Sequence, residues 1–141
     1  MIYLMRHGKA VSLSDFGDQG RWLTSEGRED VRNVASLLAK KNVKIDSVVS
    51  SPLVRAVQSA EIMASTLKYP GTLKICGDVV PEGDVEMAKL MIQKRGPNVL
   101  VLSHESFVSR FVEDLTGKEN YFATAELRCL DAKSVKWVLK P

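Results

Sequence analysis

The sequence predicts an α/β fold, a three-layer α/β/α sandwich around a mostly parallel central sheet with an antiparallel C-terminal strand. Two observations lead to this prediction. Short apolar runs, typical of buried strands, alternate along the chain with longer stretches of helical periodicity, which is the pattern of a parallel sheet covered by helices. The C-terminal stretch from residue 123 instead alternates in the manner of a closing β-hairpin, with its turn around residues 131–133.

The first half of the chain contains two strand and helix pairs. Residues 2–5, IYLM, form a mostly apolar run and predict the first strand. A helix is expected at about 25–41, because apolar residues recur there at helical spacing and Thr24 or Ser25 suits its N-cap. A short strand follows at 45–50, and Ser51 and Pro52 open the next helix, since proline suits a first turn.

The second half repeats this alternation. A third strand is expected at 73–76, followed by a helix at 84–95 that Asp84 caps and that Gly96 and Pro97 end. Residues 99–103, VLVLS, are the most apolar run in the chain and therefore predict a central strand. The last helix is expected at 105–115, ending at Gly117.

The bulk properties limit the classes of protein to consider. At 141 residues the chain has the size of one domain, so residues 1–141 are treated as a single domain. Its net charge of +3, with no long block of one sign, argues against nucleic acid as a partner. No apolar run approaches the length of a membrane span, no signal peptide fits before Arg6, and Cys76 and Cys129 are expected to be free thiols. We therefore expect a cytoplasmic protein without a membrane partner; the sequence does not indicate its oligomeric state.

Both histidines of the chain follow expected strands. Arg6, His7 and Gly8 come directly after the first strand, and His104 comes directly after the strand at 99–103. Arg55 lies in the first turn of the helix that follows the second strand. Because the carboxyl ends of parallel strands share one rim, where ligands of α/β sheets bind, we expect these side chains to converge.

Two guanidinium groups and two imidazoles are suited to binding phosphate. Arginine matches phosphate oxygens bidentately, histidine can donate to a further oxygen, and Gly8 would allow the backbone to approach the ligand. A metal is not expected, because the guanidinium groups would repel a divalent cation and no thiolate or carboxylate cluster stands at ligand spacing. A neutral His7 could also attack phosphorus and form a phosphohistidine intermediate, while His104 and the arginines stabilise the charge on the phosphoryl oxygens.

Four blocks of sequence together are similar to a known family. The chain resembles the histidine phosphatase (phosphoglycerate mutase-like) superfamily, and within it the small SixA-type phosphohistidine phosphatase branch. The resemblance implies that His7 is the phosphorylated nucleophile, that Arg6, Arg55 and His104 form the phosphate pocket, that Arg21 reaches it, and that no metal or other cofactor takes part. The blocks are Met5-Arg6-His7-Gly8-Lys9-Ala10, Arg21-Trp22-Leu23-Thr24-Ser25-Glu26-Gly27, Ser50-Ser51-Pro52-Leu53-Val54-Arg55-Ala56 and Val101-Leu102-Ser103-His104.

The general acid is less clearly indicated. Larger relatives supply a carboxylate, often from an insertion for which this chain has no room. Glu82 and Asp84 are the candidates here, and the alternative makes Asp84 a helix cap and Glu82 a solvated loop residue. Phosphohistidine would need little help from an acid, because its imidazole leaving group can be protonated near neutral pH.

The expected substrate is therefore protein phosphohistidine, and the small size of the chain leaves an open pocket that a protein surface could enter. Two alternatives stay open. One is a small-molecule phosphomonoesterase of the same family. The other is a non-catalytic phosphate- or phosphoprotein-binding module on this fold, against which the presence of both histidines and both arginines argues.

Overall fold

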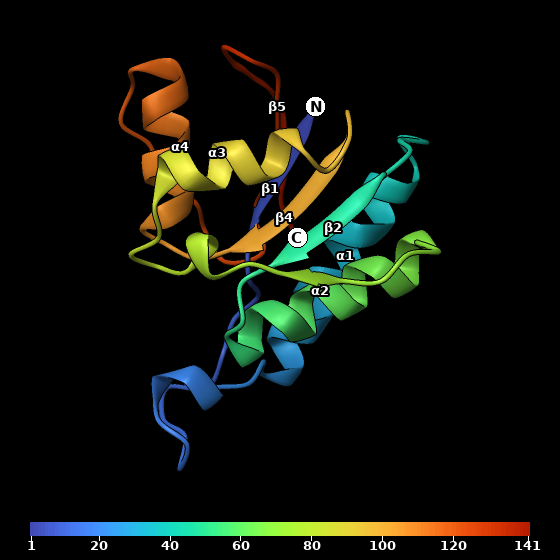
Figure 1. Ribbon diagram of the computed structural model, residues 1–141. Coiled ribbons are helices and arrows are strands. Elements are labelled where there is room, and N and C mark those ends of the chain that lie inside the picture. The colour runs from blue at the N-terminus through green and yellow to red at the C-terminus, as the bar shows by residue number, and fades with distance from the viewer.

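A six-stranded sheet forms the middle layer of the computed structural model, which describes residues 1–141 (Figure 1). The strand order is β3-β2-β4-β1-β5-β6. The first four strands of the chain run parallel, whereas β5 is antiparallel to β1 and β6 to β5, so the predicted mixed sheet with its C-terminal hairpin is confirmed. The strands are β1 (Ile2–Arg6), β2 (Ser47–Ser50), β3 (Lys74–Ile75), β4 (Val99–Ser103), β5 (Leu127–Leu130) and β6 (Val135–Leu139).

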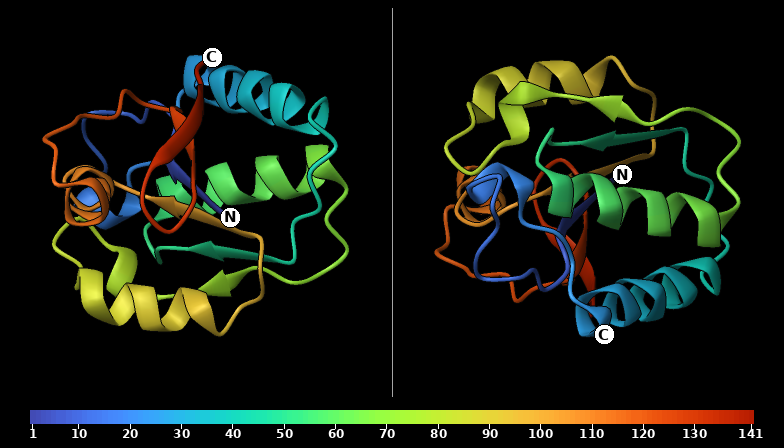
Figure 2. Two further views of the ribbon diagram at one scale, coloured as in Figure 1. Left: turned by 90° about the horizontal axis from the view of Figure 1, so that it is seen from above. Right: turned by 90° about the horizontal axis from the view of Figure 1, so that it is seen from below.

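Helices cover both faces of the sheet, which confirms the three layers. Helices α1 and α2 lie on one face and α3 and α4 on the other (Figure 2). Each face has its own apolar core, with Leu38 and Met63 on the first side and Ile92 and Phe111 on the second. No helix combines the length and the apolarity that crossing a membrane takes. The helices are α1 (Ser25–Ala39), α2 (Val54–Leu67), α3 (Val85–Gln93) and α4 (Phe107–Thr116), with short 3-10 turns at Asp18–Gly20 and Gly77–Val79.

The central strand β4 determines how the ends of its neighbouring strands line up at the edge of the sheet where the site is expected. It is buried throughout and lies between β1 and β2, as its apolar sequence predicts. Its register pairs Ser103 with Arg6 and Leu102 with Ser50. The residues that follow β1, β2 and β4 therefore leave the sheet at the same edge.

Local hydrogen bonds explain why the predicted start of α1 agrees with the structure and the predicted start of α2 does not. Thr24 caps α1 by accepting a hydrogen bond from the Gly27 N–H at 2.9 Å. Helix α2 begins at Val54 rather than at Pro52, because the chain bends at Pro52 and Leu53, where the Ser51 hydroxyl accepts the Leu53 N–H at 3.1 Å. Strand β3, Lys74–Ile75, is shorter than the predicted strand at 73–76. It is exposed and lies at the edge of the sheet, where strands are commonly short.

Two glycines bring the end of β1 against α1. A Cβ atom built on Gly8 would lie 2.7 Å from the Gly27 carbonyl oxygen, and one built on Gly27 would lie 2.0 Å from the Lys9 carbonyl oxygen. Only glycine fits such a close approach of two backbone segments. The pair thus fixes the path of the chain directly after His7.

Candidate active site

The two histidines meet at the carboxyl edge of the sheet. His7 follows β1 and His104 follows β4, and their ring centroids lie 4.9 Å apart. His7 is 6% exposed and His104 only 1%. The predicted convergence of these two imidazoles is therefore present in the structure.

The hydrogen bonds of His7 define which ring nitrogen can react. Its Nδ1 atom lies 2.6 Å from the Gly8 carbonyl oxygen, which can only accept, so Nδ1 carries the proton and Nε2 carries the lone pair. The Arg55 Nε–H donates to that Nε2 atom at 3.2 Å. Burial, together with the nearby positive charges of Arg55 and Arg6, lowers the pKa of His7 to about 4, although the Gly8 hydrogen bond opposes this. At neutral pH His7 is consequently uncharged, and its one ring lone pair, on Nε2, accepts the hydrogen bond from Arg55.

His104 is held by Ser51, the residue that follows β2. Its Nε2 atom lies 2.6 Å from the Ser51 hydroxyl, whereas its Nδ1 atom is buried without a hydrogen-bond partner. Burial first, and then the neighbouring His7 and Arg55, lower the pKa of His104 to about 2. A buried polar atom without a partner is unfavourable and is a natural position for a ligand atom.

A carboxylate already occupies the arginine donors of the site. Arg55 is 4% exposed; its Nη1 donates to the Asp18 carbonyl oxygen at 2.8 Å and its Nη2 to Asp18 Oδ2 at 3.2 Å. Arg21 donates from Nη1 to Asp18 Oδ1 at 2.9 Å and from Nε to the Val11 carbonyl oxygen at 2.7 Å. The hydrogen bond from Arg21 is the main cause that lowers the pKa of Asp18, and Arg55 adds to it. The two guanidinium groups thus share the Asp18 carboxylate.

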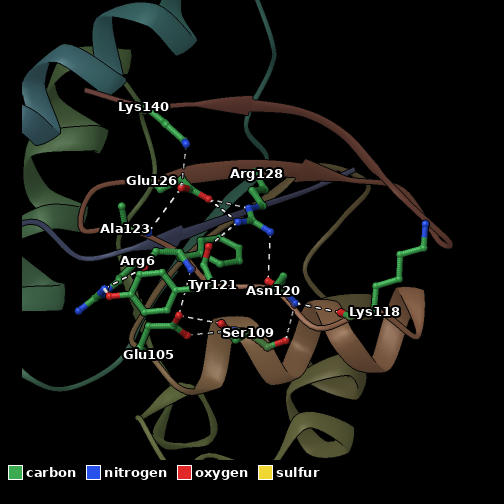
Figure 3. Close-up of polar contacts among 11 residues, drawn as sticks. Arg6, Glu105, Ser109, Lys118, Asn120, Tyr121, Ala123, Glu126, Arg128 and Lys140 are labelled. Atoms are coloured by element: carbon green, nitrogen blue, oxygen red, sulfur yellow. Dashed lines mark hydrogen bonds and ion pairs between the residues drawn. The ribbon is translucent and has the colours of Figure 1, made fainter.

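Arg6 turns toward the segment between α4 and β5 (Figure 3). Its Nη1 atom donates to the Tyr121 hydroxyl and to the Phe122 carbonyl oxygen, both at 2.8 Å. The Arg6 guanidinium also lies 5.6 Å from the centroid of the Tyr121 ring, and its Nε atom is buried without a partner. Arg6 therefore keeps its Nε–H and its Nη2 donors without a protein partner while Nη1 is anchored.

Buried charges hold that anchoring segment in place (Figure 3). Glu105 Oε2 accepts the Phe122 N–H at 3.0 Å and the Ser109 hydroxyl at 2.7 Å. Arg128 donates to the Tyr121 carbonyl oxygen at 2.6 Å and forms an ion pair with the buried Glu126. Glu105 thus joins α4 to the residues that position Arg6.

Three of the predicted residues have no hydrogen bond to either imidazole through their side chains. Gly8 was expected to offer its backbone to a phosphate, but its N–H donates to the Ser59 hydroxyl at 3.0 Å and its carbonyl oxygen binds His7. The absence of a side chain at Gly8 serves the contact with α1 instead. Asp84 is the N-cap of α3, accepting the Met87 N–H at 3.0 Å. Glu82 is exposed, and no hydrogen bond joins it to the histidines.

Sequence reasoning missed three residues that shape the site. Asp18 binds both Arg55 and Arg21, Ser51 holds His104, and Tyr121 holds Arg6. A signal existed for Asp18, which stands three residues before Arg21, and for Ser51, which directly follows a strand. Nothing in the sequence indicated Tyr121, since only the fold brings it to Arg6.

The buried neutral histidines predict a loss of stability in mild acid. An unfolded histidine takes up a proton near pH 6.5, whereas folded His7 does so only near pH 4 and folded His104 near pH 2. The unfolded state therefore binds more protons, and the free energy of unfolding should fall between pH 7 and pH 5 by on the order of 2 kcal/mol per histidine. Urea unfolding at both pH values measures this. The drop should be about half as large in His7→Asn, and an equal drop in that variant would contradict the burial argument.

Comparison with known proteins identifies the family. Residues 2–75 match the model of the histidine phosphatase superfamily (branch 1). The phosphohistidine phosphatase SixA of Escherichia coli (strain K12) is 32% identical over 118 residues, which is 81% of this chain and 73% of that protein.

Solved structures agree with this assignment. A structure of the protein histidine phosphatase SixA complexed with tungstate superposes with a TM-score of 0.90 at 29% identity, covering 99% of this chain and 96% of that one. Phosphoglycerate mutase from Bacillus anthracis str. Sterne, at 14% identity and a TM-score of 0.73 over 90% of this chain and 85% of that one, shares the fold. The chain belongs to the histidine phosphatase superfamily and is a phosphatase of SixA type.

Proposed function

We propose that this phosphatase removes phosphoryl groups from protein phosphohistidine without a metal or other cofactor, through a phosphohistidine intermediate on His7. The observation that carries the proposal is the state of His7, whose Nδ1–H is fixed on Gly8 and whose Nε2 lone pair faces the Arg55 guanidinium. The SixA proteins to which the chain is similar are named for phosphohistidine, and one of them binds tungstate, a tetrahedral oxyanion like phosphate.

In the first step the Arg55 Nε–H turns from His7 Nε2 to a phosphoryl oxygen, and the freed Nε2 lone pair forms a bond to phosphorus as the bond from phosphorus to the leaving nitrogen breaks. The phosphoryl oxygens take the places that Asp18 now occupies on Arg55, and they accept from the free Nε–H of Arg6. With the Ser51 hydroxyl as the donor to His104 Nε2, the ring would carry its proton on Nδ1 and could donate it to a further oxygen. Donors are thus arranged around the charge that develops on the phosphoryl group.

In the second step water attacks phosphorus, the bond to His7 Nε2 breaks, and phosphate leaves with the proton lost to solvent. His7 returns to its neutral form, which its lowered pKa favours. Asp18 is ionised through its arginine partners and so cannot supply a proton to the leaving group of the first step. Glu82 remains the candidate general acid for a leaving group that needs one.

No acidic group contacts the two histidines, which favours a substrate whose leaving group is easily protonated. The groups that touch His7 and His104 are guanidinium, hydroxyl and backbone groups, and Glu82 stands apart in an exposed loop. An alcohol leaving group would need an acid beside it, whereas an imidazole with a pKa near 6.5 takes its proton from water. This preference supports phosphohistidine over a phosphate monoester.

The test is a comparison of substrates with one enzyme preparation. We expect kcat/KM for a protein phosphorylated on histidine to exceed that for a panel of phosphate monoesters by at least about 100-fold, because only the first can leave without an enzymic acid. Adding a chelator should change neither rate. Faster hydrolysis of monoesters would point to a small-molecule phosphomonoesterase, and binding of phosphohistidine protein without turnover would point to a non-catalytic module.

We also propose that the protein acts in the cytoplasm. Cys76 and Cys129 are both free thiols, one partly buried and one buried, as is usual for proteins of a reducing compartment. This supports a cytoplasmic site of action on phosphorylated proteins there.

A further inference from the structure

A loop at the mouth of the site carries two apolar side chains that the protein itself does not cover. Residues 11–22 lie between β1 and α1, and Figure 1 shows this segment projecting beyond the carboxyl ends of the strands. Leu13 is 86% exposed and Phe16 is 82% exposed, more than any other large apolar residue of the chain. Leaving two such residues almost wholly in water is unfavourable unless something else covers them.

The loop is held in a defined shape. The Val11 N–H donates to the Trp22 carbonyl oxygen at 2.9 Å and closes its base. Near its tip the Ser14 hydroxyl accepts the Phe16 N–H at 3.1 Å, and the Ser14 carbonyl oxygen accepts the Gly17 N–H at 3.1 Å. Phe16 is therefore presented outward by a turn closed by hydrogen bonds.

The same loop touches the phosphate-binding arginine. Asp18 accepts hydrogen bonds from Arg55 through both its carbonyl oxygen and its carboxylate. Phe16 precedes Asp18 by two residues, so their Cα atoms lie within about 7 Å of each other, and Leu13 lies within about 18 Å of Asp18. Phe16 thus lies close to the residue that binds Arg55, and Leu13 lies within about 18 Å of it.

We propose that Leu13 and Phe16 form a docking surface for the folded protein that carries the phosphohistidine. This inference rests on the proposed function and names the kind of partner it requires. The arginines attract the phosphoryl group, and the buried position of His7 requires the phosphorylated imidazole to be inserted deeply, which brings the surface of its protein onto the loop. The matching partner has apolar residues within the same distance of its phosphohistidine.

The test separates docking from chemistry by using two sizes of substrate. Leu13→Ser and Phe16→Ser should each raise KM for a small folded protein phosphorylated on a surface histidine by roughly tenfold or more, because truncating an apolar contact at a buried interface has effects of this size. Hydrolysis of phosphoramidate, which has the same type of bond but no protein surface, should stay within about twofold of wild type. Leu90→Ser, at a 54% exposed position on α3, is the matched control and should leave both rates unchanged.

Different experimental outcomes would contradict the docking surface and the proposed function. Equal rates for wild type and both loop variants on the folded protein would overturn the docking surface and leave the proposed function intact. Failure of the wild-type enzyme to hydrolyse the phosphorylated protein would overturn the proposed function itself. A wild-type dimer that becomes monomeric in Phe16→Ser, measured by light scattering, would assign the surface to a second copy of this chain and would also overturn the proposal.

Discussion

Replacing His7 with asparagine is expected to lower kcat for phosphohistidine protein by at least about 10⁴-fold, because the variant has no ring nitrogen to form the bond to phosphorus. Asparagine keeps a polar side chain of similar size, so the packing against His104 and the contact to Gly8 are disturbed little. Steady-state rates with a single substrate, together with circular dichroism to check folding, measure the effect.

The matched control for this prediction is His104→Asn. Its role in the proposal is to donate a hydrogen bond, and the loss of one such donor lowers kcat by about 10²–10³-fold. His7→Asn should thus be the more damaging change by at least about tenfold. An asparagine variant at position 7 that retained a few per cent of the wild-type rate would show that another residue is the nucleophile.

Changing Arg55 should have the second largest effect. Arg55→Ala removes the guanidinium that contacts both His7 Nε2 and Asp18, and we expect kcat/KM to fall by about 10³-fold or more. Arg55→Lys keeps the charge but loses the planar fork, so it should recover little of that loss. The inhibition constant of inorganic phosphate, measured alongside turnover, should rise in both variants.

An exposed arginine provides the comparison for Arg55. Arg32 forms a surface ion pair with Glu29 on α1, and Arg32→Ala should leave turnover and phosphate inhibition unchanged. If Arg55→Lys bound inorganic phosphate as tightly as wild type, the bidentate contact would not be part of the site. The phosphate pocket would then have to be built from Arg6 and Arg21.

Much of the fold was predictable because its causes are local. The apolar run at 99–103 predicts a buried strand and is the central strand β4, and the caps Thr24 and Asp84 act where hydrogen bonding to the first helical turn requires them. The mixed sheet followed from alternation of strands and helices with a C-terminal hairpin. The meeting of His7 with His104 followed in turn, since the ends of neighbouring parallel strands share one edge.

The details that escaped prediction depend on contacts between distant segments. Gly8 seemed suited to a ligand, but the structure uses its small size for the approach of α1. The binding of Asp18 to Arg55 depends on how the loop after β1 folds back, and the binding of Arg6 to Tyr121 depends on the ion pairs that place the chain after α4. No periodicity or motif in the sequence encodes these arrangements.

The central claim is that His7 Nε2 carries the phosphoryl group between the two steps. Incubation with a radiolabelled phosphohistidine protein, a rapid alkaline quench and mass spectrometry of the digested enzyme should find an acid-labile phosphate on the peptide that contains His7. The label should be absent from His7→Asn. A wild-type enzyme that turns over substrate without such a label at any quench time, or a label that persists in His7→Asn, would contradict the account.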